Sequence, residues 1–205
     1  MEWCNTNDLR LNVSKTKEMI VDFRQKRPPL APLTIDGTDV EQVTSFRFLG
    51  AVINNTLTWD NQCRAILGKA RQRLYFVRKL KSFRVKKKIL ISFYRSIVES
   101  ILTSSITVWY DRATILDLYK LQSVVRHAER LIGTRLPTLN ELYLKRMSMK
   151  SSKIMKDNFH PAFEYFEFLP SNRRLRAYMG NKRFVDSFYP QAIKYYNGTR
   201  TNRIY

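Results

Sequence analysis

The pattern of hydrophobic and polar residues changes near residue 55. Before that point, short apolar runs such as "EMIVDF" and "FRFLGAVI" alternate with turn residues. Such alternation predicts short strands, with "IDG" as a turn between two of them and Gly50 as a β-bulge or a point of close backbone approach. We therefore expect a small, mostly antiparallel β segment over residues 1–55.

The spacing of apolar residues becomes helical from Thr58 onward. Residues three and four positions apart share one face of a helix, so this spacing predicts a long amphipathic helix, with Thr58 as its N-cap. The residues of the apolar stripe are Trp59, Cys63, Ile66, Ala70, Leu74 and Val77.

Three more helices are expected after the first. The segment "KKILISFYRSIVESILTSSITVWY" is more apolar and should be more buried, and the next helix should begin at Thr114 and end at Gly133. A fourth helix should begin near Pro137, after which aromatic residues and arginines mix without a clear period. The predicted fold class is therefore α+β, mainly α. Its parts are a β segment (1–55), a helical bundle (56–135) and a less regular, basic aromatic C-terminal region (136–205).

Charge adds a functional expectation to this fold. The 205 residues include 37 Lys and Arg against 17 Asp and Glu, a formal net charge of +20. So large an excess indicates a polyanionic partner, with nucleic acid first and an anionic membrane second. With 44% hydrophobic residues, the chain also has enough apolar side chains for a folded core.

The strongest charge signal lies in "CRAILGKARQRLYFVRKLKSFRVKKK", residues 63–88, which contains no Asp or Glu. An ordinary solvated helix face carries interspersed acidic residues that form pairs along the helix. We therefore expect this stretch to bind a phosphate backbone. If about six cations each neutralise a phosphate, log affinity should fall against log salt with a slope of roughly −5 on duplex. The expected contact residues are Arg64, Lys69, Arg71, Arg73, Arg78, Lys79, Lys81, Arg84, Lys86, Lys87 and Lys88.

Aromatic residues accompany both basic segments. Helical spacing predicts core packing for most of the first set, although any of them could stack on bases. That set comprises Tyr75, Phe76, Phe83, Phe93 and Tyr94. In "SNRRLRAYMGNKRF", Arg173, Arg174 and Arg176 fit either a nucleic-acid contact or a surface loop anchored by aromatics.

Catalytic and metal-binding patterns are scarce. His127 and Glu129 superficially match a two-His, one-carboxylate iron site with His160, but on a helix residues two apart point about 200° away from each other. His160 precedes Pro161 and is expected to pack or to cap a turn. The sequence has no adjacent acidic pair, phosphate-cradling glycine loop or G-x-S-x-G motif, so we expect no metal, no small-molecule substrate and no catalysis by this chain alone.

Two cysteines, Cys4 and Cys63, are too few for a disulfide scaffold, and the first ten residues lack the apolar run of a signal peptide. The longest apolar stretch is interrupted by Glu99 and is expected to be too short to span a bilayer. These features favour an intracellular protein, nuclear or cytoplasmic, without a transmembrane segment. The oligomeric state is left open.

Several segments in order resemble the carboxyl-terminal part of reverse transcriptases from LINE-type non-LTR retrotransposons. They include "WCNTNDLRLNVSKTKEMIVDF", "IDGTDVEQVTSFRFLGAVINNTLTW", "FYRSIVESILTSSITVWY" and "HPAFEYFEFLPSNRRLRAYMGNKRF". The resemblance implies the last palm strands, a thumb and a tail, with an RNA or DNA template–primer duplex as partner. The catalytic aspartates that hold Mg in that family would lie before this chain, so it implies no polymerase activity here.

The same resemblance implies roles for a few residues. Lys15 or Lys17 would match a palm lysine that protonates the leaving pyrophosphate. The favoured interpretation of Lys15 itself is a solvated lysine in a turn. Phe48, Leu49 and Gly50 would match a hairpin that grips the primer, and a plain strand end with a bulge is the alternative.

Two other interpretations remain open. The opening stretch is also similar to a short domain named after the amino-terminal part of the alkylated-DNA repair protein AlkB homologue 8. The dioxygenase and methyltransferase chemistry of that protein is not carried over, because the chain lacks a spaced His, Asp, His set and a glycine-rich nucleotide loop. The second alternative is a basic scaffold that docks an acidic protein or a membrane.

Overall fold

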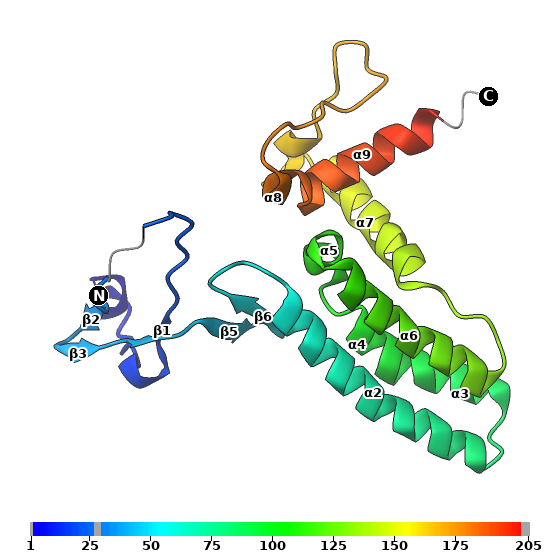
Figure 1. Cartoon of the computed structure of the whole chain (residues 1–205). Helices are drawn as coiled ribbons and strands as arrows, with labels where there is room; N and C mark the ends of the chain where they lie inside the picture. The colour runs from blue at the N-terminus through cyan, green and yellow to red at the C-terminus, as the bar shows by residue number, and fades with distance from the viewer. Residues whose placement is uncertain (1, 27–29, 202–205) are drawn as a thin grey trace. The chain divides into compact units, whose positions relative to one another are not determined.

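The computed structural model describes residues 2–26 and 30–201 and divides the chain into two compact units, Met1–Gln62 and Cys63–Tyr205 (Figure 1). Helices dominate, and strands are few and short. This confirms the predicted fold class, α+β and mainly α. The division into three parts, with boundaries near residues 55 and 135, stays a prediction.

The first unit holds a short helix, a 3₁₀ turn and three small β ladders. Its elements are α1 (Glu2–Thr6), η1 (Val13–Lys15), β1 (Lys17–Glu18), β2 (Thr34–Ile35), β3 (Thr38–Asp39), β4 (Glu41–Gln42), β5 (Ser45–Phe48) and β6 (Ala51–Asn54). The β2–β3 and β5–β6 ladders are antiparallel, as expected, whereas β1 pairs with β4 in parallel. The predicted strand "EMIVDF" is wrong beyond Glu18, because β4 pairs with residues 17 and 18 alone.

Both antiparallel hairpins turn on two residues with positive φ. Asp36 (φ 48°) and Gly37 (φ 73°) join β2 to β3, which confirms the predicted "IDG" turn. Leu49 (φ 47°) and Gly50 (φ 86°) join β5 to β6. Gly50 is therefore a hairpin turn residue and not a bulge, because a two-residue loop between twisted strands requires positive φ at both central positions.

Helix α2 (Asp60–Ser82) confirms the predicted amphipathic helix, since every residue of the apolar stripe is buried. Polar contacts fix its start. The Thr58 hydroxyl donates to Asp60 Oδ1 at 2.6 Å, Asn54 Oδ1 accepts from Thr58 N–H at 2.9 Å, and Val52 N–H donates to Gln62 Oε1 at 2.8 Å.

The second predicted helix is interrupted. It consists of α3 (Lys87–Tyr94), a π-helical turn η2 (Arg95–Glu99), α4 (Ser100–Leu102), α5 (Ile106–Trp109) and η3 (Tyr110–Arg112). Between α4 and α5 the backbone turns at Thr103–Ser105, where Ser105 has φ 49°. Side chains favour this turn, because the Thr103 hydroxyl donates to Glu99 O and Trp109 Nε1–H donates to Ser104 O.

By length and composition, the helical segment Lys87–Arg112 could cross a membrane. The expectation that this stretch is too short was therefore wrong. The segment also supplies buried core residues, including Tyr94, Val98, Leu102 and Trp109, and α3 contacts α6 while α5 contacts α7. A third of the most apolar window of this segment is buried inside the fold.

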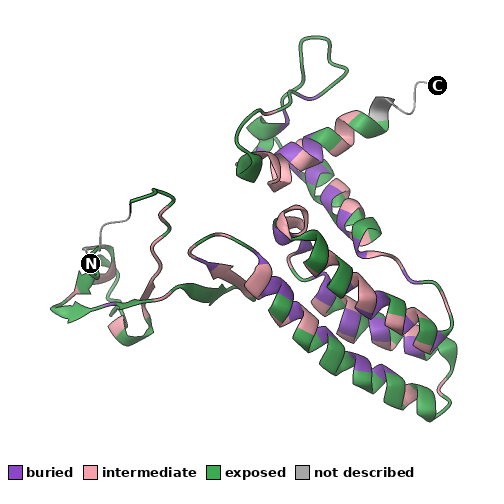
Figure 2. Ribbon diagram, in the orientation of Figure 1, coloured by how far each residue is buried: buried purple, intermediate pink, exposed green. Residues whose placement is uncertain are grey.

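The remaining helices cover this core. Helix α6 (Ile115–Ile132) has the predicted caps, since Thr114 accepts from Asp117 N–H and Gly133 adopts φ 72°. Helix α7 (Leu139–Lys156) begins with a capping box between Thr138 and Glu141. Figure 2 shows buried residues on the facing sides of the helices in this unit.

The C-terminal region contains η4 (Phe163–Phe166), α8 (Lys182–Val185) and α9 (Phe188–Thr201). Helix α9 was not predicted, because its buried residues, Pro190, Ala192 and Ile193, form no long apolar stripe. It is held by tertiary contacts with α7 and η4.

Candidate nucleic-acid interface

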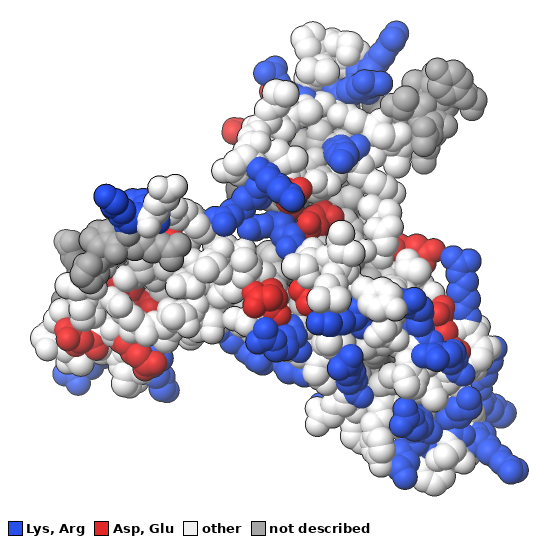
Figure 3. Space-filling model, in the orientation of Figure 1, with Lys and Arg blue, Asp and Glu red and all other residues white. Residues whose placement is uncertain are grey.

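Helix α2 displays its cations on the faces that its buried stripe leaves free. All eleven Lys and Arg side chains of residues 63–88 are exposed. Arg64, Arg71 and Arg78 recur every seven residues, which places them along one flank at intervals of about 10.5 Å. Figure 3 shows Lys and Arg gathered at the lower right, where Figure 1 places the end of α2, the start of α3 and the end of α6.

The cations continue through the turn from α2 to α3. Arg84 lies just after the end of α2 and has φ 54°. This left-handed conformation is usually adopted by glycine at a helix C-terminus. Lys86 precedes α3, and Lys87 Nζ donates to Gly133 O. The basic turn is therefore fastened to the end of α6.

A contact between α2 and α6 extends the basic surface. Arg78 Nη2 lies 3.3 Å from His127 Nε2. Partial burial lowers the pKa of His127, and the positive charges of Arg130 and Arg78 lower it further. The Arg126 guanidinium lies 4.8 Å from the centre of the Tyr119 ring on the same helix.

Sequence reasoning missed Arg126 and Arg130 as members of this surface. The segment "RHAER" places two arginines four residues apart on α6, but the sequence alone does not show that α6 lies beside α2. We call the α2 cations, the turn 84–88, His127, Arg126 and Arg130 together the basic surface.

Four ion pairs join cations that lie outside the stretch 63–88. Lys17 pairs with Glu41, and Arg24 lies 2.8 Å from Asp22. Arg135 lies 3.3 Å from Glu141, and Arg176 lies 3.2 Å from Glu167. The carboxylates of these four pairs lie outside α2.

Three aromatic side chains of α2 and its end are exposed, so the prediction of core packing is wrong for Tyr75, Phe76 and Phe83. They lie off the buried stripe, whereas Tyr94 is fully buried as that prediction requires, and Phe93 is half-buried. Lys79 Nζ lies 5.8 Å from the Tyr75 ring centre, and Arg73 Cζ lies 5.9 Å from that of Phe76. Two cation–ring contacts therefore lie on this surface.

The second basic segment forms an exposed loop. Phe168 and Leu175 make an antiparallel bridge, and Leu175 exchanges two hydrogen bonds with the Asn197 side chain of α9. Arg173 and Arg174 are exposed between these anchors, whereas Arg176 pairs with Glu167. Tyr178 packs edge-on against Tyr165 and Phe184. The surface-loop interpretation thus gains the more direct structural support.

Residues proposed from the resemblance lie in the first unit. Lys15 is exposed at the end of η1, and Lys17 pairs with Glu41 across the β1–β4 ladder. Phe48, Leu49 and Gly50 form the tip of the β5–β6 hairpin, where the Leu49 side chain is 88% exposed.

The two histidines do not approach a common metal. His127 faces Arg78, and His160 Nδ1 accepts from Ala162 N–H at 3.0 Å, which confirms its expected role in a turn. Residues 2–26 and 30–201 contain no group of three or more His, Cys, Asp or Glu side chains able to hold a metal ion.

Comparison with known proteins corrects the expected family. The family described as "Alkylated DNA repair protein alkB homolog 8, N-terminal" matches residues 59–100. The resemblance to a reverse transcriptase is overturned by this finding, and the roles of Lys15, Lys17 and Phe48–Gly50 that depended on it lose their basis. No curated protein and no solved structure matches the chain.

The matched segment begins just before α2 and ends in α4. It contains all eleven cations of residues 63–88. The chain is thus similar to the AlkB homologue 8 N-terminal family over the part that carries the basic helix.

Proposed function

We propose that the chain is a nucleic-acid-binding module that holds a phosphate backbone with the basic surface. The observation that carries this proposal is the set of eleven exposed cations on α2 and the turn after it, uninterrupted by any acidic residue from Asn61 to Val98. Cations that lie so close together repel one another, and a polyanion relieves the repulsion.

Two further observations support a nucleic acid over other polyanions. Exposed rings beside the cations offer stacking faces for the bases of a single strand. The similar family is named for a protein of alkylated-DNA repair, which favours DNA among the nucleic acids to be tested first. The proposal includes binding and no catalysis.

The test is a binding titration of the full chain at several salt concentrations. Fluorescence anisotropy with labelled duplex and single-stranded oligonucleotides should show log affinity falling against log salt, with a slope of roughly −5 on duplex and a smaller one on single strands. Anionic lipid vesicles and a polyglutamate peptide serve as competitors. Tighter binding to either competitor than to the oligonucleotides would reject the proposal in favour of a docking scaffold.

A further inference from the structure

A solvent-open cavity of about 460 Å³ lies beside α7, lined by residues of α7, of the loop that precedes it and of η2. Three cations line it, Arg95 from η2, Arg135 from the loop before α7, and Lys145 from α7. Apolar side chains of Leu136, Pro137 and Leu142 complete the wall. The cavity is formed within the second unit and is lined by residues outside the basic surface.

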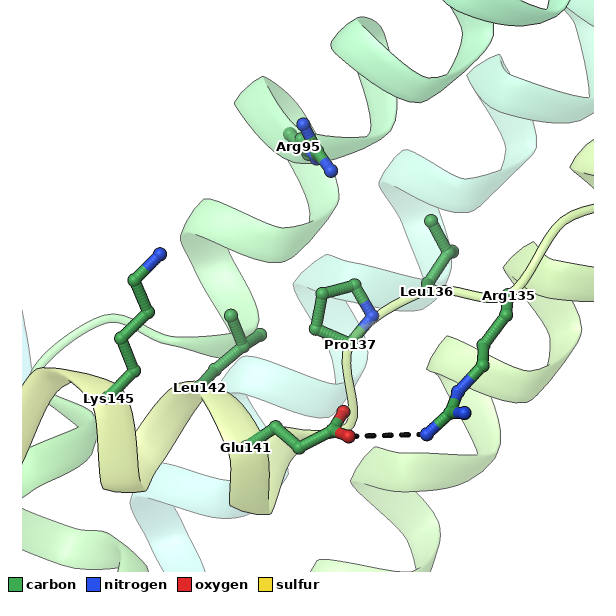
Figure 4. Close-up of a pocket in the computed structure, with 7 residues that line it drawn as sticks. All are labelled: Arg95, Arg135, Leu136, Pro137, Glu141, Leu142 and Lys145. Atoms are coloured by element: carbon green, nitrogen blue, oxygen red, sulfur yellow. Dashed lines mark hydrogen bonds and ion pairs between the residues drawn. The ribbon is translucent and has the colours of Figure 1, made fainter.

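The lining of this cavity has three cationic side chains and one carboxylate. Its one carboxylate, Glu141, is engaged by its neighbours: Oε2 accepts from Thr138 N–H at 2.7 Å, and Oε1 accepts from Arg135 at 3.3 Å. The hydrogen bond from Thr138 N–H lowers the pKa of Glu141, so this carboxylate stays ionised and occupied. Figure 4 shows Arg135 directed at Glu141, whereas Arg95 and Lys145 lie on the other side of Pro137 and Leu142.

Glu99 is the nearby carboxylate that interacts with Arg95 and Lys145 through space. Burial raises the pKa of Glu99 despite these cations, and its Oε2 has no hydrogen-bond partner in the described structure. Arg95 and Lys145 are exposed and can meet an anion from solvent.

We propose that this cavity binds a phosphorylated nucleoside, with its phosphate at Arg95 and Lys145. The nucleoside lies against Pro137 and Leu142. The volume of the cavity falls within the range of small-ligand sites. Its charged end and its apolar wall match a ligand that has a phosphate and a flat, weakly polar base. A phosphorylated nucleoside can be a free nucleotide or the 5′ end of a nucleic-acid strand. Binding of a strand end rests on the proposed function, whereas binding of a free nucleotide does not.

The experiment compares pairs of ligands that differ by one phosphate. For the strand end, a single-stranded oligonucleotide with a 5′-phosphate is titrated against its 5′-hydroxyl twin. For the free source, adenosine 5′-monophosphate is titrated against adenosine by calorimetry. We expect the phosphate to strengthen binding about tenfold in at least one pair, and the pair that responds identifies the source.

Variants then separate this site from the basic surface. Arg95→Gln with Lys145→Gln should abolish the advantage of the phosphate, whereas Lys153→Gln, which removes a charge from the same helix outside the cavity, should preserve it. Arg71→Gln with Arg78→Gln should weaken both oligonucleotides equally and leave their ratio unchanged. Arg95→Lys keeps the charge and guards against a folding defect. Equal affinity within both pairs for the unaltered chain, or an advantage that survives the Arg95 and Lys145 substitutions, overturns the proposal.

Discussion

Arg78 Nη2 lies 3.3 Å from His127 Nε2, so a cation of α2 meets a titratable ring of α6. This contact joins two helices whose charged residues form one surface. It also places a histidine, whose pKa is lowered from its ordinary value of 6.5, on the surface proposed to bind phosphate. Several consequences of the proposed binding role depend on this arrangement.

The lowered pKa of His127, caused first by partial burial and then by Arg130 and Arg78, makes stability depend on pH. Because the pKa of His127 in the folded chain is below its ordinary value of 6.5, the unfolded chain takes up the proton first. The contribution of neutral His127 to the free energy of unfolding is therefore fully present above pH 6.5. It declines as the pH falls from 6.5 toward the lower pKa of the folded chain. Urea unfolding at pH 7.5 and 5.5 should show a smaller decline for His127→Gln than for the unaltered chain. An equal decline in both would contradict this role.

Binding should respond to pH in the opposite direction. A phosphate beside Arg78 and Arg130 would stabilise protonated His127, so affinity for an oligonucleotide should rise as the pH is lowered from 7.5 to 6. The expected gain is up to a few-fold, measured by anisotropy at constant ionic strength. His127→Gln should remove the gain. Persistence of the gain in that variant would place the responsible group elsewhere.

Because Arg84 has a left-handed backbone conformation, we expect its replacement by glycine to raise stability and to weaken binding. A non-glycine residue with φ 54° costs roughly 1 kcal/mol relative to glycine, so Arg84→Gly should raise the free energy of unfolding by about 0.5–1 kcal/mol. The same change removes a cation from the basic turn and should weaken duplex binding severalfold at low salt. Arg84→Asn, which also tolerates this conformation, is the matched control for loss of charge. A variant that is both less stable and fully competent to bind would refute this account of Arg84.

Exposed aromatic side chains should contribute most to single strands. Phe83 is 75% exposed, so Phe83→Ala should change stability by less than about 0.5 kcal/mol. If its ring stacks on a base, single-stranded affinity should drop by roughly 1–3 kcal/mol, and duplex affinity should change much less. Phe159→Ala, at a 98% exposed ring outside the basic surface, is the control. Equal effects of the two substitutions on single-stranded binding would rule out stacking by Phe83.

Local signals in the sequence predicted part of this structure well. Thr114 and Gly133 mark the ends of α6 because a cap depends on its own neighbours, and the α2 stripe follows from spacing alone. The break at Thr103–Ser105 depends on competing side-chain hydrogen bonds, and α9 depends on contacts with α7. Neither the break nor helix α9 can be predicted from the spacing of hydrophobic residues.

The candidate site divides in the same way. The α2 cations were predicted because an unbroken basic run is visible in one dimension. Arg126, Arg130 and the cavity at Arg95 required the packing of α2, α6 and α7, which brings distant segments together. The exposed Tyr75, Phe76 and Phe83 were misjudged because their helical context was taken as a sign of burial.

The salt dependence of duplex binding tests the central claim most directly. The unaltered chain is compared with Arg71→Gln/Arg78→Gln/Lys79→Gln and with a control of equal charge, Lys15→Gln/Lys153→Gln/Lys156→Gln. Each lost phosphate contact lowers the magnitude of the slope by about 0.9, so the first variant should fall by about 2–3 from roughly 5, and the control should stay within about 0.5. Equal slopes for the two variants would show that net charge, and not the basic surface, governs binding, and would contradict the account.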